Sequence, residues 1–256
     1  MTTTDTTSAH DRTDSGTSIY DHGDIYEAIY MSRGKDYAAE SALVTSLVRE
    51  RLPEADSLLD VGCGAGSHLQ CFAGHFGHAE GLDLSADMVR KNEERGTGIR
   101  VTRGDMRDFA LGRRFDAVVS MFNVVAYSAG TDELDATLAC FARHLNPGGV
   151  IVIEPWWLPE DFLDGYVATD SFQWKGRSYA RISHTVRDGD SSHMEVHYLV
   201  ASAEEGVTHF SDVHRARLFQ RADYENAIRR AGCAVEYVRA EHAPRGLFIG
   251  TAPRAA

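Results

Sequence analysis

The pattern of apolar and polar positions predicts five short strands in the first 154 residues, separated by glycine-rich or polar segments. They cover residues 57–61, 79–83, 99–103, 114–121 and 150–154. The fourth run is apolar almost continuously, as in a strand that is covered on both faces. Helices are predicted at 36–48, from Ser67, at 85–95 behind a Ser85 cap, and at 131–145 behind a Thr131 cap, with the Asn146–Gly149 turn ending the last one. This alternation predicts an α/β fold.

The pattern changes after residue 154. Alternating polar and apolar positions at 172–185, 192–201 and 207–218 predict an antiparallel sheet that is inserted into the parallel one. In the second segment, Met194, Val196, Tyr198 and Val200 share one face of the strand. A helix at 221–231 and strands at 234–239 and 246–251 follow.

Four regions are therefore expected. Residues 1–18 are rich in Thr, Ser and Asp and predict a disordered tail. Residues 19–154 form an α/β core that begins with lid helices, where Ile19, Ile25 and Ile29 recur at helical spacing. Residues 155–219 form the antiparallel insertion, with a role in substrate binding or dimer contact. Residues 220–252 complete the core sheet.

A glycine turn follows the first predicted strand directly. Asp60 is followed by Gly62, Gly64 and Gly66, and the next helix starts at Ser67. Glycines permit positive φ and place no Cβ between the backbone and a ligand, and the helix N-terminus offers free N–H groups. A dinucleotide fingerprint needs a glycine where Ser67 stands, so the turn favours another ligand.

Acidic residues end the next two predicted strands. Asp83 follows the second, where it can accept both hydroxyls of a ribose. Asp105 and Met106 follow the third, where a carboxylate can accept from an adenine amine and a thioether can pack on the purine. The alternative for either aspartate is a helix cap or a turn. Together with Asp60, the set suits S-adenosylmethionine (SAM), which offers an ammonium, a ribose diol and an adenine amine.

These motifs resemble a known family. D-x-G-x-G-x-G at 60–66, the acid at Asp83, Gly104-Asp105-Met106 and Asn146-Pro147-Gly148-Gly149 are similar to those of class I SAM-dependent methyltransferases. The resemblance implies a Rossmann-like sheet and SAM as the cofactor. Before residue 34 the chain carries Tyr20, Tyr26 and Tyr30. For Tyr20 and Tyr26 an aromatic face over the sulfonium and ordinary helix packing are both open, and packing is the expectation for Tyr30.

Composition narrows the class of partner. The chain has 256 residues, 43% of them hydrophobic, and a net charge of −12, which argues against binding to a nucleic-acid backbone. The four cysteines have no metal-ligand spacing, and with no apolar run long enough for a membrane span we expect a cytoplasmic protein. No metal site is expected, because His193 and His197 lie about 13 Å apart on a strand.

Candidate substrate residues follow the fourth and fifth strands. Tyr127 can accept or pass on a substrate proton, or it can be a partly buried core tyrosine. Glu154, Trp156 and Trp157 combine a carboxylate with two aromatic plates, suited to an ammonium or hydroxyl and to a base or sugar. Arg245 suits a phosphate or carboxylate, or it forms a surface ion pair.

More specific segments narrow the resemblance. Glu154-Pro155-Trp156-Trp157, Phe210-Ser211-Asp212-Val213-His214 and Arg245-Gly246-Leu247-Phe248 are similar to those of the N,N-dimethyltransferases of TDP-aminosugar biosynthesis, which make desosamine and mycaminose. The chain has Asn123-Val124 where those relatives have two serines. The resemblance implies SAM contacts from Tyr26, Tyr37, Gly62, Asp83, Asp105, Met106 and Met121, and nucleotide-sugar contacts from Tyr20, Tyr127, Glu154, Trp156 and Arg245.

The expected function is SAM-dependent N-methylation, with two methyl groups added, of a TDP-linked aminodeoxysugar in antibiotic biosynthesis by a homodimer. Two alternatives stay open. One is an O-methyltransferase, which needs a base for its alcohol, although no His–Asp pair is evident from the sequence. The other is a non-catalytic SAM-binding subunit, against which the three intact aspartates at the strand ends argue.

Overall fold

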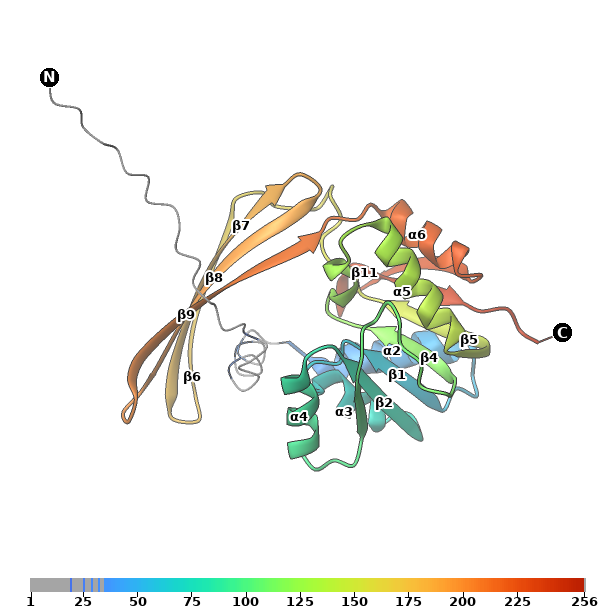
Figure 1. Ribbon diagram of the computed structural model, residues 1–256, viewed down its shortest axis with the longest axis horizontal. Helices are drawn as coiled ribbons and strands as arrows, with labels where there is room; N and C mark the ends of the chain where they lie inside the picture. Colours follow the sequence, from blue (N-terminus) through green and yellow to red (C-terminus); the bar gives the residue numbers. More distant parts are fainter. Residues whose placement is uncertain (1–18, 20–24, 26–28, 30–31, 33–34, 256) are drawn as a thin grey trace, which may run out of the picture.

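The computed structural model describes Ile19, Ile25, Ile29, Ser32 and residues 35–255. The predicted tail at 1–18 and the two lid tyrosines Tyr20 and Tyr26 lie outside the described residues. Within them, two sheets stand side by side, and the smaller one lies on one side of the α/β core (Figure 1).

The core sheet has seven strands in the order β10-β11-β5-β4-β1-β2-β3. Strands β1 to β5 pair in parallel, whereas β11 pairs antiparallel with both β5 and β10. The strands are β1 Ser57–Val61, β2 His78–Asp83, β3 Arg100–Arg103, β4 Phe115–Ser120, β5 Leu145–Ile153, β10 Ala234–Ala240 and β11 Ala243–Thr251. This is the class I methyltransferase arrangement that the sequence predicts.

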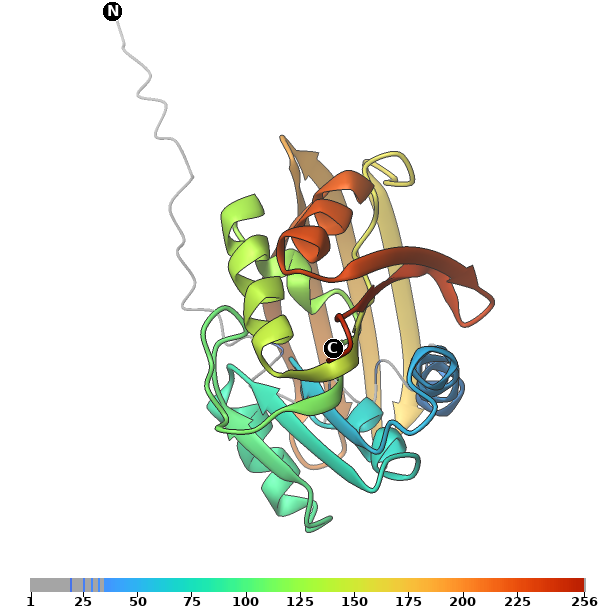
Figure 2. The same ribbon diagram turned by 90° about the vertical axis from the view of Figure 1, so that its right-hand side faces the viewer.

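Alternation along the strands builds a core on each face of this sheet. Leu58 and Leu59 are both fully buried, but Leu58 packs with residues of α2 (Tyr37–Arg51) and α3 (Ser67–Ala73). Leu59 packs instead with residues of α5 (Thr131–Arg143) and α6 (Arg221–Arg230). Successive side chains of a strand point to opposite faces, so the sheet lies between two helical layers. Helices α5 and α6 lie against each other (Figure 2).

The helix starts follow local capping, with one correction. The Asp36 carboxylate accepts a hydrogen bond from the Ala39 N–H at 2.9 Å and caps α2. Ser85 caps α4 (Ala86–Glu94) through the Met88 N–H. Thr131 was expected to cap α5, but it is the first helical residue and extended Gly130 holds the cap position. Its hydroxyl therefore supplies no capping hydrogen bond.

The predicted boundary between α5 and β5 is also wrong. Helix α5 ends at Arg143, and β5 begins at Leu145, which pairs with Phe115 of β4. The Asn146–Gly149 turn therefore lies inside the strand as an irregularity. The Gly148 N–H donates to the Pro253 carbonyl, and Gly149 accepts from the Ala252 N–H. These hydrogen bonds to Ala252 and Pro253 hold the turn within the strand.

The insertion forms a separate antiparallel sheet in the order β6-β7-β8-β9. Its strands are β6 Tyr166–Trp174, β7 Arg177–Asp188, β8 Ser191–Ser202 and β9 Gly206–Arg217. The single strand expected at 172–185 is a hairpin, because Lys175 and Gly176 both adopt positive φ, as in a two-residue hairpin turn. The four-residue face predicted on β8 is confirmed: Val196, Tyr198 and Val200 are buried and Met194 packs beside them.

The inner face of this sheet is covered by the start of the described chain. Ile19, Ile25 and Ile29 are at most 7% exposed and pack against Tyr179 and Val196. The Ile19 N–H also donates to Asp212 Oδ2 at 2.8 Å. The predicted isoleucine spacing therefore serves packing on the insertion. None of the helices in the described part of the chain is long and apolar enough to cross a membrane.

Candidate functional site

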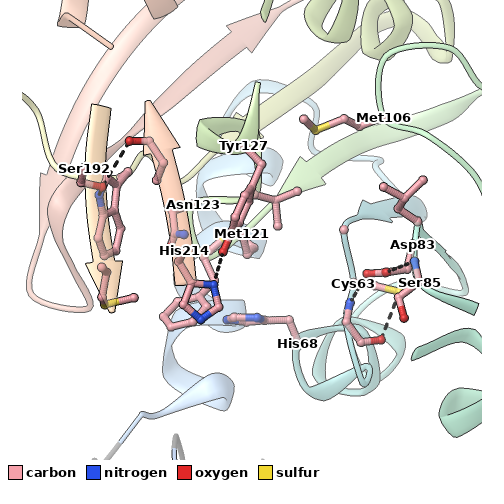
Figure 3. Close-up of a pocket in the computed structure, with 18 of the residues that line it drawn as sticks. Cys63, His68, Asp83, Ser85, Met106, Met121, Asn123, Tyr127, Ser192 and His214 are labelled. Carbon is pink, nitrogen blue, oxygen red and sulfur yellow. Dashed lines mark hydrogen bonds between the residues drawn. The ribbon is translucent and has the colours of Figure 1, made fainter. Parts of the chain in front are cut away.

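One cavity of about 800 Å³ lies between the carboxyl ends of the core strands and the inner face of the insertion. Its wall combines Asp60, Asp83 and Asp105 from the core with Arg181 and His214 from the insertion. Figure 3 shows side chains from both sheets pointing into it. The insertion follows β5 in the chain, and its four strands form the second wall of the cavity.

The glycine turn after β1 adopts positive φ at all three predicted glycines. A Cβ at Gly62 would clash with the Val124 side chain, and one at Gly66 would clash with the Asn92 amide. At Gly64 a Cβ would meet nothing within 4 Å. The clearance expected for a ligand is therefore used by the protein's own side chains at Gly62 and Gly66, and Gly66 does not line the cavity. Backbone conformation alone requires glycine at Gly64.

Asp60 is the most unusual group in the site. Its side chain is 1% exposed, lines the cavity, and its Oδ2 has no hydrogen-bond partner among the described residues. Burial, together with the charge of nearby Asp83, raises the pKa of Asp60 to about 8. A buried carboxylate without a donor fits a cationic group bound in the cavity, and an amino-acid ammonium supplies both charge and donors.

Asp83 is held rigidly at the end of β2. Its Oδ2 accepts from the Gly64 N–H at 2.8 Å and its Oδ1 accepts from the Ser85 N–H at 2.8 Å. These bonds tie the acid to the glycine turn, as Figure 3 shows. Burial raises the pKa of Asp83 despite both bonds. Each carboxylate oxygen keeps a second lone pair, so the group can still accept from a diol.

Asp105 and Met106 line the same cavity farther along the sheet edge. Asp105 forms a two-point ion pair with Arg107, at 2.9 Å from Nε and 2.6 Å from Nη2, and this hydrogen bonding lowers its pKa. Arg107 also donates to Glu133 at 2.7 Å. An adenine amine would therefore have to share the Asp105 carboxylate with Arg107, which the spacing of the sequence does not reveal.

Tyr37 belongs to a cluster that the sequence did not indicate. Its ring meets the His68 ring edge-on at 4.8 Å, and both side chains line the cavity. His68 Nε2 lies 2.6 Å from the Glu40 carboxylate, which also accepts from Lys35 Nζ at 2.8 Å. Burial alone would raise the pKa of Glu40, but the hydrogen bond from His68 and the charge of Lys35 hold it below its usual value. The sequence shows only that Glu40 lies in a predicted helix, 28 positions before His68, and no local pattern links the two residues.

Trp156, Trp157 and Arg245 meet at the far end of the cavity. The Arg245 guanidinium lies 4.9 Å from the Trp156 ring and 4.6 Å from the Trp157 ring. The Tyr237 hydroxyl donates to the Arg245 carbonyl at 2.7 Å, while Trp156 Nε1 donates to Ser192 Oγ at 3.0 Å. Aromatic faces orient the cation, so an anion can meet a guanidinium whose position is already set.

Glu154 does not join this group. Its side chain is 9% exposed and does not line the cavity. Its Oε2 accepts from the Phe122 N–H at 2.7 Å. Phe122 and Asn123 both have positive φ without being glycine, so the carboxylate holds a strained turn in place. In this structure Glu154 contacts the backbone of the loop after β4 and is not brought together with the predicted substrate residues that line the cavity. Met121, in the same loop, lines the cavity.

Tyr127 lies at the end of the short helix η2 (Val124–Tyr127) and lines the cavity with 41% of its surface exposed. Its hydroxyl lies 3.2 Å from Nδ1 of His214 on β9. His214 Nε2 lies 3.7 Å from Asp212 Oδ2. The structure therefore assembles the His–Asp pair that the sequence did not reveal, because alternation along β9 places both side chains on the inner face.

Arg181 is another cavity residue that was not recognised from the sequence. It is 5% exposed on the inner face of β7, lines the cavity, and lies 3.3 Å from Asp170 Oδ2. On the outer face, His197 Nδ1 lies 3.0 Å from His209 Nε2, and Glu195 lies 2.9 Å from His197. No group of three or more His, Cys, Asp or Glu among the described residues is arranged to hold a metal ion.

Comparison with known proteins identifies similar chains. A family model described as a methyltransferase domain matches residues 58–149. A dTDP-3-amino-3,4,6-trideoxy-alpha-D-glucopyranose N,N-dimethyltransferase of Streptomyces venezuelae is 53% identical over 230 residues, 90% of this chain and 97% of the relative. A dTDP-4-amino-2,3,4,6-tetradeoxy-D-glucose N,N-dimethyltransferase of Saccharopolyspora spinosa is 43% identical, over 91% of this chain and 94% of the relative.

A solved structure gives the same picture. The SAM-bound amino pentose methyltransferase CalS10 of Micromonospora echinaspora, from calicheamicin biosynthesis, superposes with a TM-score of 0.82. It is 44% identical, and the alignment covers 89% of this chain and 96% of CalS10. The likeness includes both the core sheet and most of the remaining chain, so it extends beyond the methyltransferase domain alone.

Asp60→Asn is expected to remove a pH-dependent loss of stability from the ligand-free protein. An unfolded aspartate has a pKa of about 3.9, whereas folded Asp60 has a pKa of about 8. The folded form holds a proton that the unfolded form releases, so this contribution to the free energy of unfolding is present below about pH 4 and lost as the pH rises through the folded pKa.

Urea unfolding of both proteins between pH 5 and pH 9 measures this effect. We expect the wild-type protein to lose stability relative to the asparagine variant as the pH rises. Parallel stability curves for the two proteins would show that Asp60 ionises normally and would remove the argument for a cation beside it.

Proposed function

The chain belongs to the family of dTDP-aminosugar N,N-dimethyltransferases, and on that premise we propose that it methylates the amino group of a TDP-linked aminodeoxysugar twice, with SAM as methyl donor, in antibiotic biosynthesis. One observation carries the proposal beyond family membership. A single cavity joins the buried Asp60 carboxylate, whose Oδ2 is unpaired within the described part of the chain, to the Arg245 guanidinium beside two tryptophans. A cationic cofactor and an anionic nucleotide-sugar can thus occupy opposite ends of one space.

The core end holds the cofactor. SAM, when bound, supplies a methyl group that is already activated on a sulfonium. Asp60 accepts from its ammonium, Asp83 from its ribose hydroxyls, and Asp105 from its adenine amine, while Met106 packs on the purine. Tyr37 and Met121 line the remainder of this end. Because Asp83 is tied to Gly64, the diol acceptor and the glycine turn hold a common position.

The insertion end holds the nucleotide-sugar. Trp156 and Trp157 offer aromatic faces to the base or sugar, and Arg245 offers a guanidinium to the diphosphate. Residues 155–219 therefore form the substrate-binding wall, to which the core adds Tyr127 and Arg245, while 19–154 and 220–252 form the core that binds the cofactor. When the sugar packs on the tryptophans, its amine is proposed to lie in the middle of the cavity, where the Tyr127 oxygen can accept a hydrogen bond from it.

The reaction places modest demands on the protein. A neutral amine is a competent nucleophile, so the side chains must orient the nitrogen, exclude water and receive a proton. O-methylation would need a stronger base. The sequence shows no evident His–Asp pair for that role, but the structure places His214 beside Tyr127, so the lack of a base no longer argues against O-methylation. Both relatives are N,N-dimethyltransferases of aminosugars, which favours N-methylation.

Assembly as a cytoplasmic homodimer completes the proposal. The outer face of the four-stranded sheet exposes Ile182, Leu199 and Val213 by 42–53% on three adjacent strands. These apolar side chains alternate on that face with His184, Glu195, His197 and His209. An exposed sheet face that mixes apolar and polar groups can contact a second copy of itself. The four cysteines are free thiols, as is usual in a reducing compartment.

Methyl transfer is tested directly with synthetic TDP-3-amino- and TDP-4-amino-deoxysugars and SAM. Mass spectrometry is expected to show a gain of two methyl groups on one of them, since relatives act on both amine positions. Boiled protein and a TDP-sugar with a hydroxyl in place of the amine are the controls. Methylation of the hydroxyl sugar instead would favour the O-methyltransferase alternative, and SAM binding without any product the non-catalytic one.

Arg245→Gln is expected to lower kcat/KM for the nucleotide-sugar by about 10- to 100-fold, because a charge-assisted hydrogen bond contributes about 1.5–3 kcal/mol. Calorimetric affinity for SAM should stay unchanged. Arg229→Gln, on the exposed side of α6, is the matched control. Equal losses in nucleotide-sugar and SAM binding would show that Arg245 serves the fold of the site rather than the diphosphate.

Paired Ile182→Lys and Leu199→Lys substitutions test the dimer. Sedimentation velocity should give a dimer for the wild-type protein and a monomer for the double variant, because buried lysines on facing sheets repel and lose hydration. Lysine at exposed Leu163 is the control, since that residue lies at the cavity and not on the outer face. A wild-type monomer would end this part of the proposal.

A further inference from the structure

His214 lines the cavity but has no role in the N-methylation proposed above. It comes from the inner face of β9 and reaches across the cavity to the core, where Nδ1 lies 3.2 Å from the Tyr127 hydroxyl. Figure 3 shows this contact between the insertion strand and the turn that carries Tyr127. It joins the two walls of the cavity at the position where the substrate amine is proposed to lie.

The surroundings of His214 determine which way this hydrogen bond runs. The charged and titratable described groups that face it are Asp212 from β9, Arg181 from β7 and Tyr127 from η2, while β8 presents Met194. The Asp212 carboxylate lies on the Nε2 side at 3.7 Å, which favours hydrogen on Nε2. Nδ1 is then an acceptor, and the Tyr127 hydroxyl donates to it.

Burial lowers the pKa of His214, an effect to which the charge of Arg181 adds and which the charge of Asp212 opposes. The imidazole is therefore neutral at pH 7 and able to take up a proton. Tyr127 lines the cavity, and a phenol oxygen that donates its hydrogen to Nδ1 can also accept a hydrogen bond. Substrate N–H groups can meet an acceptor there, although a phenol alone is a weak base.

We propose that His214 receives the proton that the substrate nitrogen gives up through Tyr127, so that Tyr127, His214 and Asp212 form a proton relay. An ammonium N–H bond breaks as the proton moves to the Tyr127 oxygen, and the Tyr127 proton moves to Nδ1 of His214. The amine keeps the electron pair, Tyr127 remains neutral, and the imidazolium lies beside the Asp212 carboxylate. The starting state returns when the imidazolium gives the Nδ1 proton to solvent and keeps the proton on Nε2.

This relay rests on the proposed function. It would meet a requirement of double methylation, namely removal of a proton from the nitrogen between the two transfers. Methyl transfer to an amine produces an ammonium, which has no lone pair for a second transfer. The nitrogen must therefore lose a proton before each transfer. A tyrosine that only accepts a hydrogen bond cannot hold that proton at neutral pH, whereas an imidazole behind it can.

His214→Gln tests the relay, since a glutamine amide can accept a hydrogen bond but cannot take up a proton. At saturating substrates, kcat at pH 7 is expected to fall by about 100-fold, a usual effect for losing general-base catalysis. It should recover as the pH rises toward the amine's own ionisation, and monomethylated product should accumulate. His209→Gln, on the outer face of the same strand, is the matched control.

Tyr127→Phe provides a second variant that does not depend on packing, because Tyr127 is 41% exposed. It should show the same pH recovery, and the double variant should be no slower than either single variant, as expected for groups that act as one unit. Circular dichroism and SAM calorimetry report whether each variant is folded.

Three results would overturn the relay: a wild-type pH profile in folded His214→Gln, an equal loss at every pH, or additive losses in the double variant. If His214→Gln fails to fold, the Tyr127→Phe profile alone decides, and a wild-type profile there is a negative result. Absence of any methylation by the wild-type protein would instead defeat the proposed function, so the two failures are distinguishable.

Discussion

Parallel pairing of β1 with β2 and β4 is the constraint on which the site depends. Each parallel strand ends at the same edge of the sheet, so Asp60, Asp83 and the Met121 loop meet there although they are far apart in the chain. The glycine turn follows β1 too tightly for side chains at Gly62 and Gly66, whose space is taken by Val124 and Asn92. The turn, the acids and the loop after β4 therefore hold one another in position.

Burial of Asp60 is the energetic cost of this arrangement. Burial and the charge of Asp83 raise the pKa of Asp60, whose Oδ2 has no hydrogen-bond partner among the described residues, so the ionised form of the empty site is destabilised. Glu154 shows the opposite choice, because its carboxylate satisfies the Phe122 N–H in a strained turn. Two acids near the same edge thus have different surroundings: Asp60 lines the cavity, and Glu154 accepts a hydrogen bond from the backbone.

The insertion changes a cofactor cleft into a two-walled cavity. Its inner face supplies Arg181, Ser192 and His214, and it is anchored by packing of Ile19, Ile25 and Ile29 on its aromatic residues. The Ile19 N–H bond to Asp212 joins that packing to the proposed relay.

Most of the elements could be predicted from the sequence, because strand length, glycine turns and helix caps are local properties. The acids at 60, 83 and 105, the glycine turn and the family resemblance were also evident from local motifs. Element ends that depend on distant partners were not: β5 starts early because Leu145 pairs with Phe115, and the 172–185 segment folds into a hairpin through positive φ at Lys175.

Side-chain partnerships were decided by tertiary structure alone. Tyr127 and His214 are 87 positions apart, and Glu40 and His68 are 28 apart. Glu154 has the motif of a substrate residue, yet it turns to a backbone N–H. Local sequence determined which residues stand at the sheet edge, whereas strand order and the position of the insertion decided which groups they face, because those contacts depend on distances that no local pattern encodes.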